Sequence, residues 1–215
     1  MEPVFVRPEE IEKRSFEIIT SELEKMGKTL PEDRDYIIKR AIHTTADFDY
    51  ADTMYFSEDA VSKVLNLIKN GATVVTDTNM ALSGINKKTL YSFGGECVCY
   101  MADEEVCEVA KRTGSTRAAV SMEKASKIEK PVIFAIGNAP TALVKLREMY
   151  DAGIYRPAFI IGVPVGFVNV EAAKELIIDT DIPCIINRGR KGGSNVAAAI
   201  VNALLYRLRD IGASC

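Results

Sequence analysis

The sequence predicts an α/β fold of three layers, in which a mostly parallel sheet of about five strands lies between helices and a helical N-terminal extension precedes it. Three observations support this fold class. Short apolar runs of four or five residues recur from residue 73 onward. Stretches with apolar residues at helical spacing separate these runs. The alternation is typical of parallel strands whose connecting helices cover both faces of the sheet.

The first 70 residues are expected to be helical. A first helix begins at Pro8, where proline suits the opening turn, and ends near Gly27. A second begins near Pro31 and continues through the apolar positions 37–42. A third begins at Ser57, which is expected to cap it ahead of two acidic residues, and ends at Asn70-Gly71.

From residue 71 onward, the expected strands and helices alternate. The strands are Thr73–Thr76, Cys97–Met101, Val132–Ile136, Phe159–Gly162 and Cys184–Asn187. The helices lie near Glu104–Arg112, Arg117–Lys127, Thr141–Ala152, Val170–Ile178 and Ser194–Arg209. Because no low-complexity tract or long linker divides the chain, we expect a single domain over residues 1–215. Its helical part would be residues 1–70 and its α/β core residues 71–215.

Composition indicates an ordinary globular protein and argues against two classes of partner. The chain has 47% apolar and 27% charged residues, with a formal net charge of −3. Acidic and basic residues are interleaved and there is no tryptophan, so we expect no nucleic-acid partner. No apolar run approaches the roughly 20 residues that cross a bilayer, and the N-terminus lacks the apolar core of a secretory signal. We therefore expect a cytoplasmic protein with no membrane partner.

The five cysteines are an odd number without the spacing of a disulfide scaffold, and they fit reduced cytoplasmic thiols. Cys97 and Cys99 lie two apart on an expected strand and so share one face. Zinc sites usually need four ligands, and no Cys or His pair elsewhere completes such a set. Buried structural thiols are the favoured interpretation, and no metal is expected.

Four segments that follow expected strands are small, polar or rich in glycine. They are Asp77–Met80, Gly137–Thr141, Val163–Phe167 and Arg188–Ser194. Ligands of open parallel sheets bind beyond the carboxyl ends of the strands. We therefore expect these four segments to lie along one edge and to form a wide surface rich in hydrogen-bond donors.

The last of these segments has the features of an anion site. Two glycines and Ser194 precede a long apolar helix, and Arg188, Arg190 and Lys191 add positive charge. Phosphate or carboxylate would suit it. Its lysine precedes the glycine pair, unlike the lysine of a Walker A motif, and no Gly-x-Gly-x-x-Gly sequence indicates a dinucleotide. A solvated basic turn with a good helix cap explains the same residues equally well.

His43 is the only histidine of the chain, and it lies in a polar stripe of the second helix with Tyr36, Arg40 and Asp47. Imidazole is the side chain best suited to proton transfer near neutral pH. Arg40 could hold a carboxylate while His43 donates a proton, with Asp47 orienting the imidazole if the helix extends that far. An exposed face with ordinary side-chain pairs is the alternative. On the first helix, Ser15 interrupts the apolar face, and a serine there usually bonds back to its own helix.

Segments along nearly the whole chain resemble the precorrin-8X methylmutase family, which includes the cobalt-precorrin-8 methylmutases of cobalamin biosynthesis. The matching segments are Arg14-Ser15-Phe16, Arg40 to His43, Gly114 to Arg117, Ala135 to Leu143, Gly162 to Val168 and Arg188 to Ser194. The Gly-Asn-Ala-Pro-Thr-Ala-Leu and Pro-Val-Gly-Phe-Val runs are highly specific.

The resemblance implies an isomerase that moves a methyl group from C-11 to C-12 of precorrin-8X or cobalt-precorrin-8. His43 would be the catalytic residue, acting as proton donor and acceptor, and Ser15 and Arg40 would contact the substrate. The resemblance further implies a homodimer without a separate cofactor. By the same match, Arg117 and the four loops would line the pocket, so the further candidate contacts are Asn138, Thr141, Gly166, Arg188, Gly193 and Ser194.

The residues agree with this implied reaction. A corrinoid is a wide apolar disc edged with carboxylates, and it needs a broad pocket with scattered cations and backbone donors. An intramolecular rearrangement requires one proton donor rather than a nucleophile or a metal. Two other functions remain open from the sequence. One is a tetrapyrrole carrier without catalysis, and the other is a transferase or hydrolase that binds a phosphate at the 188–194 loop.

Overall fold

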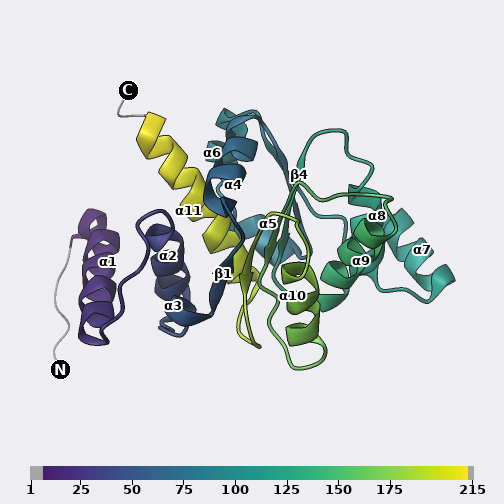
Figure 1. Cartoon of the computed structure of the whole chain (residues 1–215). Coiled ribbons are helices and arrows are strands. Elements are labelled where there is room, and N and C mark those ends of the chain that lie inside the picture. Colours follow the sequence, from purple (N-terminus) through teal and green to yellow (C-terminus); the bar gives the residue numbers. More distant parts are fainter. Residues whose placement is uncertain (1–6, 213–215) are drawn as a thin grey trace.

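The structure, a computed structural model, describes residues 7–212 and contains a six-stranded sheet with helices on both faces (Figure 1). The strands are β1 (Met54–Phe56), β2 (Thr73–Thr76), β3 (Glu96–Val98), β4 (Val132–Ile136), β5 (Phe159–Gly162) and β6 (Cys184–Asn187). Their spatial order is β1-β6-β5-β4-β2-β3. All neighbouring pairs are parallel except β1 and β6. The predicted three-layer α/β class is confirmed.

The helices of one layer build the larger part of the core. They are α2 (Asp35–Thr45), α4 (Ala60–Lys69), α5 (Asn79–Gly84), α6 (Lys87–Ser92) and α11 (Ser194–Gly212). Apolar residues of α2, α4 and α11 pack on one face of the sheet, on residues such as Ile133 and Ile161. The first helix, α1 (Pro8–Lys25), packs outside α2 (Figure 1).

The opposite layer contains α7 (Glu104–Thr113), α8 (Arg117–Ala125), α9 (Pro140–Asp151) and α10 (Val170–Ile178). Leu143 and Leu146 of α9 and Ile177 of α10 pack against Phe134 and Ile160, which point to this side of the sheet. Because successive residues of a strand face opposite sides, β4 and β5 supply both cores with apolar side chains. This explains why their sequences are apolar throughout.

The residues before position 71 are not entirely helical. A short helix, α3 (Tyr50–Thr53), leads directly into β1, whose three residues pair antiparallel with β6 at the edge of the sheet. Three residues are too few to show the alternation that identifies a strand in sequence. The other difference among the strands is β3. It begins at Glu96 and ends at Val98, whereas the sequence predicts a strand over Cys97–Met101.

Ser57 does not have the predicted role of helix cap. Its hydroxyl accepts a hydrogen bond from Cys184 N (2.9 Å) and its own N–H donates to the Cys184 carbonyl (3.0 Å). Ser57 therefore extends the contact of β1 with β6, and α4 begins three residues later at Ala60. In the part of the chain that the structure describes, no helix is long and apolar enough to span a membrane.

Candidate functional site

The carboxyl ends of β2, β4, β5 and β6 lie at one edge of the sheet, and we call residues 77–80, 137–141, 163–168 and 188–194 the rim. Asp77 is 0% exposed and accepts hydrogen bonds from the backbone N–H groups of Gly137 (2.9 Å), Asn138 (2.8 Å) and Ala139 (2.6 Å). Burial raises the pKa of Asp77, and these bonds oppose that rise. The carboxyl group thus ties the segment after β4 to the end of β2.

The other rim segments also contact one another closely. The hydroxyl oxygens of Thr78 and Ser194 are 2.8 Å apart, and Gly193 N–H donates to the Val163 carbonyl (2.9 Å). A Cβ atom on Gly192 would lie 2.0 Å from the same carbonyl oxygen, so only glycine permits this approach. The rim is therefore a set of interlocked segments from four distant parts of the sequence.

The 188–194 loop carries cations that already have partners. Lys191 pairs with Asp47 (2.6 Å) and Asp49 (2.5 Å), Arg190 with Glu171 (2.7 Å), and Arg188 with Glu175 (3.5 Å). A phosphate would have to compete with these carboxylates. The geometry gives the phosphate-site interpretation no support.

The sequence predicts that Asp47 orients His43 only if the second helix extends to Asp47, and the helix does not reach that far. Helix α2 ends at Thr45, and Asp47 lies beyond it in the turn toward α3. Its hydrogen bond with the Lys191 ammonium holds the pKa of Asp47 below its usual value. This ion pair joins the 188–194 loop to the end of the helix that carries His43.

Apolar side chains project from the rim. Met80 is 71% exposed, Val165 47%, Phe167 83% and Val168 78%. We call these four residues the apolar rim. Exposed apolar side chains gathered at the ligand-binding edge of a parallel sheet are typical of a surface that binds an apolar ligand.

His43 is exposed on α2, and its imidazole stacks on the ring of Phe16 from α1, with ring centroids 5.5 Å apart and planes 19° from parallel. It lines a cavity of about 360 Å³, which we call the His43 pocket. The other residues of this pocket are Arg40, Thr44, Met80, Gly84, Asn195, Ala198, Ala199, Asn202 and Tyr206. Since Met80 belongs to the apolar rim and Asn195 follows Ser194, this pocket adjoins the rim.

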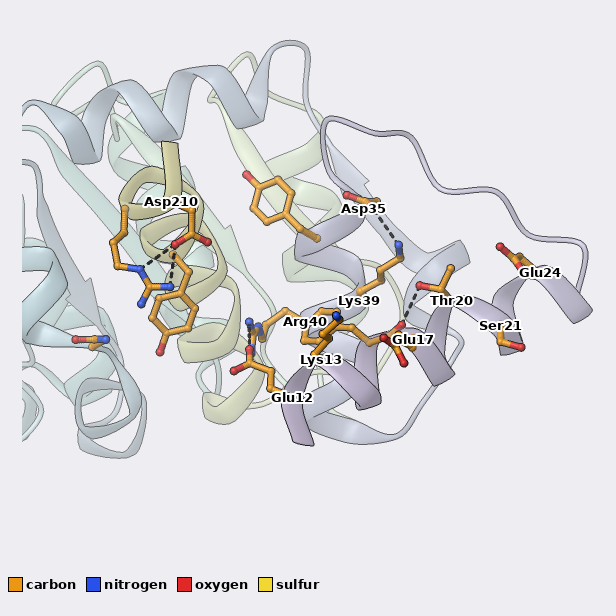
Figure 2. Close-up of a pocket in the computed structure, with 15 residues that line it drawn as sticks. Glu12, Lys13, Glu17, Thr20, Ser21, Glu24, Asp35, Lys39, Arg40 and Asp210 are labelled. Carbon is orange, nitrogen blue, oxygen red and sulfur yellow. Dashed lines mark hydrogen bonds and ion pairs between the residues drawn. The ribbon is translucent and has the colours of Figure 1, made fainter. Parts of the chain in front are cut away.

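Arg40 separates the His43 pocket from a larger cavity of about 970 Å³ between α1, α2 and the end of α11. Its guanidinium lies over the rings of Phe16 (4.7 Å) and Tyr206 (5.4 Å), and it pairs with Glu12 (2.5 Å; Figure 2). Arg40 Nε is buried and has no hydrogen-bond partner among the described residues. The aromatic rings thus fix a cation one turn from His43.

The remaining candidate residues lie in two places. Ser15 Oγ donates to the Ile11 carbonyl (2.9 Å), as expected for a serine bonded to its own helix, and it lines neither of the two cavities described above. Arg117 is the first residue of α8, and Thr141 is the second residue of α9 and belongs to the rim. The Arg117 side chain donates to the Met101 carbonyl (3.3 Å), and Thr141 accepts from Thr116 (2.9 Å).

The structure therefore places the rim candidates together along one edge, with Arg40 and His43 beside that edge on α2. Sequence reasoning did not single out Phe16 and Tyr206, which hold Arg40, or the buried Lys174, which contacts the 188–194 loop. Their types and spacing are those of ordinary helix residues. Within residues 7–212, no group of three or more His, Cys, Asp or Glu side chains could hold a metal ion.

The family described as CbiC, precorrin-8X methylmutase, matches residues 10–207. The chain belongs to the precorrin-8X methylmutase family. The cobalt-precorrin-8 methylmutase of Salmonella typhimurium is 45% identical, over 95% of this chain and 97% of that protein. That of Priestia megaterium is 44% identical over 94% and 89% of the two chains. A solved precorrin-8X methylmutase from Thermus thermophilus matches with a TM-score of 0.84 and 37% identity, covering 94% of this chain and 97% of that one.

Proposed function

We propose that this protein is an isomerase that moves a methyl group from C-11 to C-12 of a precorrin-8 macrocycle, giving hydrogenobyrinate or cobyrinate. One observation carries the proposal beyond family membership. The only histidine of the chain stands exposed in a pocket that adjoins the apolar rim. A proton donor beside an apolar surface is the arrangement that an acid-assisted rearrangement of a wide apolar ring requires.

The rim would bind the macrocycle. The side chains of Met80, Phe167 and Val168 would contact the face of the ring, since they are exposed and apolar. The carboxylates at its edge would reach two exposed side chains: that of Arg117, next to the rim, and that of Arg188, which would exchange Glu175 for the substrate. Asn138, Thr141, Gly166, Gly193 and Ser194 would add hydrogen bonds from side chains or backbone. A bidentate guanidinium suits a carboxylate.

His43 would donate a proton to the macrocycle as the methyl group migrates, and it would recover the proton afterwards. The stack on Phe16 limits the orientations of the imidazole. Arg40, held by two aromatic rings, would release Glu12 and pair with a carboxylate of the substrate instead. Ser15, one residue before Phe16, would contact the substrate from α1. General-acid assistance contributes about 10²–10⁴ in rate.

We further propose that the protein is a cytoplasmic homodimer. Ile11 and Ile18 lie two turns apart on α1 and are 52% and 50% exposed, although this helix packs on α2. A second copy of the chain could cover them. The free thiols of Cys97, Cys99, Cys107 and Cys184 fit a reducing compartment. Light scattering of the purified protein measures the number of subunits.

The visible spectrum of the macrocycle provides the test. Purified protein is mixed with metal-free precorrin-8X or with its cobalt form, and conversion is followed for the wild type and for His43→Ala. We expect conversion by the wild type and a loss of about 10²–10⁴ in kcat for the variant. The names of the Salmonella and Priestia relatives favour the cobalt form as the better substrate.

Lys130→Met is the matched control, because Lys130 pairs with Glu96 at the opposite edge of the sheet. It should convert substrate at the wild-type rate. Full activity of His43→Ala would refute the role of His43. Tight binding without conversion by any form of the protein would indicate a carrier. Protection against heat by a phosphate ester, with no binding of either macrocycle, would indicate the phosphate-loop function.

A further inference from the structure

Lys174 is a fully buried lysine on α10, in the helical layer opposite the one that contains α2. Its ammonium donates hydrogen bonds to the backbone carbonyls of Gly189 (2.6 Å) and Lys191 (2.9 Å). Both carbonyls belong to the 188–194 loop of the rim. Burial of an ammonium group is unfavourable unless its N–H groups are hydrogen-bonded. Lys174 and this loop therefore depend on each other.

Two further residues of α10 contact the 188–194 loop. Glu171 lies three residues before Lys174 and four residues before Glu175, and residues at these helical spacings are neighbours on the helix surface. Glu171 pairs with Arg190 (2.7 Å) and Glu175 with Arg188 (3.5 Å). These two pairs are at the surface, with side chains about half exposed, and such pairs contribute little to stability. The buried bonds of Lys174 are the stronger restraint.

Asn187 supports the same loop from β6 and shares one carbonyl, that of Lys191, with Lys174. It is 0% exposed, and its amide nitrogen donates to the carbonyls of Lys191 (2.9 Å) and Arg188 (3.3 Å). Thr53 donates to the Asn187 amide oxygen (2.7 Å), which fixes the orientation of the amide. The Lys191 carbonyl thus faces inward to two buried donors, while the Lys191 ammonium faces outward to its two carboxylates.

We propose that Lys174 is a positioning residue for the substrate site, and that its two hydrogen bonds hold the 188–194 loop in the form that binds substrate. In this form Gly193 bonds to Val163 and Ser194 contacts Thr78, so the start of α11 lies against the rim. Without Lys174 the carbonyls of Gly189 and Lys191 would lose a buried donor, and the loop would open to obtain water. The identity of the ligand rests on the proposed function, but the role in holding the loop does not.

Trypsin tests the loop without any substrate. Cleavage after Arg188, Arg190 or Lys191 requires the loop to open, and cleavage after Lys111 or Arg112 at the end of α7 reports unfolding elsewhere. Lys174→Met keeps most of the length of the side chain and removes its donors. We expect cleavage in the loop to become at least about tenfold faster, corresponding to the loss of about one net hydrogen bond. In Lys174→Met, the rate of cleavage at the α7 sites should equal that of the wild type. In the control variant Lys130→Met, the rate of cleavage in the loop should also equal that of the wild type.

Steady-state kinetics with the macrocycle test the link to the site. A displaced loop should raise KM at least about tenfold and leave kcat within about twofold, because His43 lies on another element. A residue that only stabilises the fold would reduce the active fraction, lowering apparent kcat at unchanged KM. Lys174→Gln retains an amide donor and should give intermediate values of KM and of loop cleavage.

The outcomes separate the proposal from the proposed function. If no form of the protein converts the macrocycle, the proposed function fails, and the trypsin rates still decide whether Lys174 holds the loop. Unchanged loop cleavage in Lys174→Met would overturn the proposal, as would a loss of kcat at constant KM. If Lys174→Met and Lys174→Gln both open the α7 sites together with the loop, Lys174 supports the whole fold and the proposal is also overturned.

Discussion

The rim and the exposed side of α2, where α1 packs, differ in how firmly their side chains are held. In the rim, Asp77 is buried and binds three backbone amides, and segments from four strands are interlocked. On the other side of the pocket, His43 is exposed and is oriented by one ring stack with α1, which packs outside α2. The difference indicates that the proposed binding surface is preformed, whereas the side chain of the proposed proton donor is restrained by one ring contact, although the helix that carries it is packed in the core.

The largest effect is expected at Asp77. Asp77→Ala would remove the charged acceptor of three backbone N–H groups, of which that of Gly137 is buried, and should lower the free energy of unfolding by about 4 kcal/mol. Urea denaturation measures this change. Asp77→Asn keeps one carbonyl oxygen as an acceptor, so its free energy of unfolding should fall by less than that of Asp77→Ala. If Asp77→Ala were as stable as the wild type, the rim would not be the rigid region of the comparison.

The next largest effect is a pH dependence caused by Lys174. Burial lowers the pKa of this lysine from its ordinary value of 10.5 to about 8. Between these values the unfolded chain binds one more proton than the folded protein, so the free energy of unfolding should rise with pH. Relative to Lys174→Met, the wild type should gain about 3 kcal/mol between pH 7 and pH 11.

Denaturation of both proteins at several pH values measures this difference. The comparison with Lys174→Met cancels the titration of other lysines and of the tyrosines. A difference that stays constant across this range, or that falls with rising pH, would contradict a depressed pKa at Lys174.

A smaller effect on stability is expected at Phe16. Phe16→Ala removes the ring that stacks on His43 and lies under Arg40, and should lower the free energy of unfolding by about 1 kcal/mol. The substitution should also lower kcat, because the imidazole would lose its orientation, and this loss should exceed about tenfold. Phe16→Leu retains apolar packing without the stack and serves as the control. Wild-type kcat in both variants would show that the stack does not position His43.

The smallest effect is expected where the two regions meet. Lys191→Ala breaks the pairs with Asp47 and Asp49, in which the three side chains are 28–63% exposed. Exposed pairs contribute about 0–1 kcal/mol, and salt screens them. The free energy of unfolding should therefore fall by less than about 1 kcal/mol, and by less still at high salt. A loss of several kcal/mol would mean that the regions are one rigid unit.

The sequence predicted the elements whose signal is local. Val132–Ile136 and Phe159–Gly162 are strands as expected, because continuous apolar runs bounded by polar residues suit a strand buried on both faces. The features it did not predict depend on distant partners. Ser57 forms hydrogen bonds with Cys184, Asp47 pairs with Lys191, and β1 exists because β6 offers an edge.

The candidate site also contains residues that could be predicted from the sequence and residues that could not. The rim segments could be predicted because the carboxyl ends of parallel strands share an edge. The roles of His43 and Arg40 rest on their polar stripe and on the family resemblance, and that of Ser15 rests on the resemblance alone. All three stay predictions until variants are assayed. Lys174 could not be found from sequence, since a lysine among Glu171 and Glu175 resembles the solvent face of an amphipathic helix.

The interlocking of the rim also has a consequence for folding. Thr78 contacts Ser194, which is 116 residues away, and Thr53 bonds to Asn187 over 134 residues. Contacts between such distant residues form late, after the loop between them has closed. During synthesis, the first half of the chain must wait for β6 and α11 to leave the ribosome. The proposed substrate surface is therefore completed only when nearly the whole chain has been translated, and truncated products cannot display a partial site.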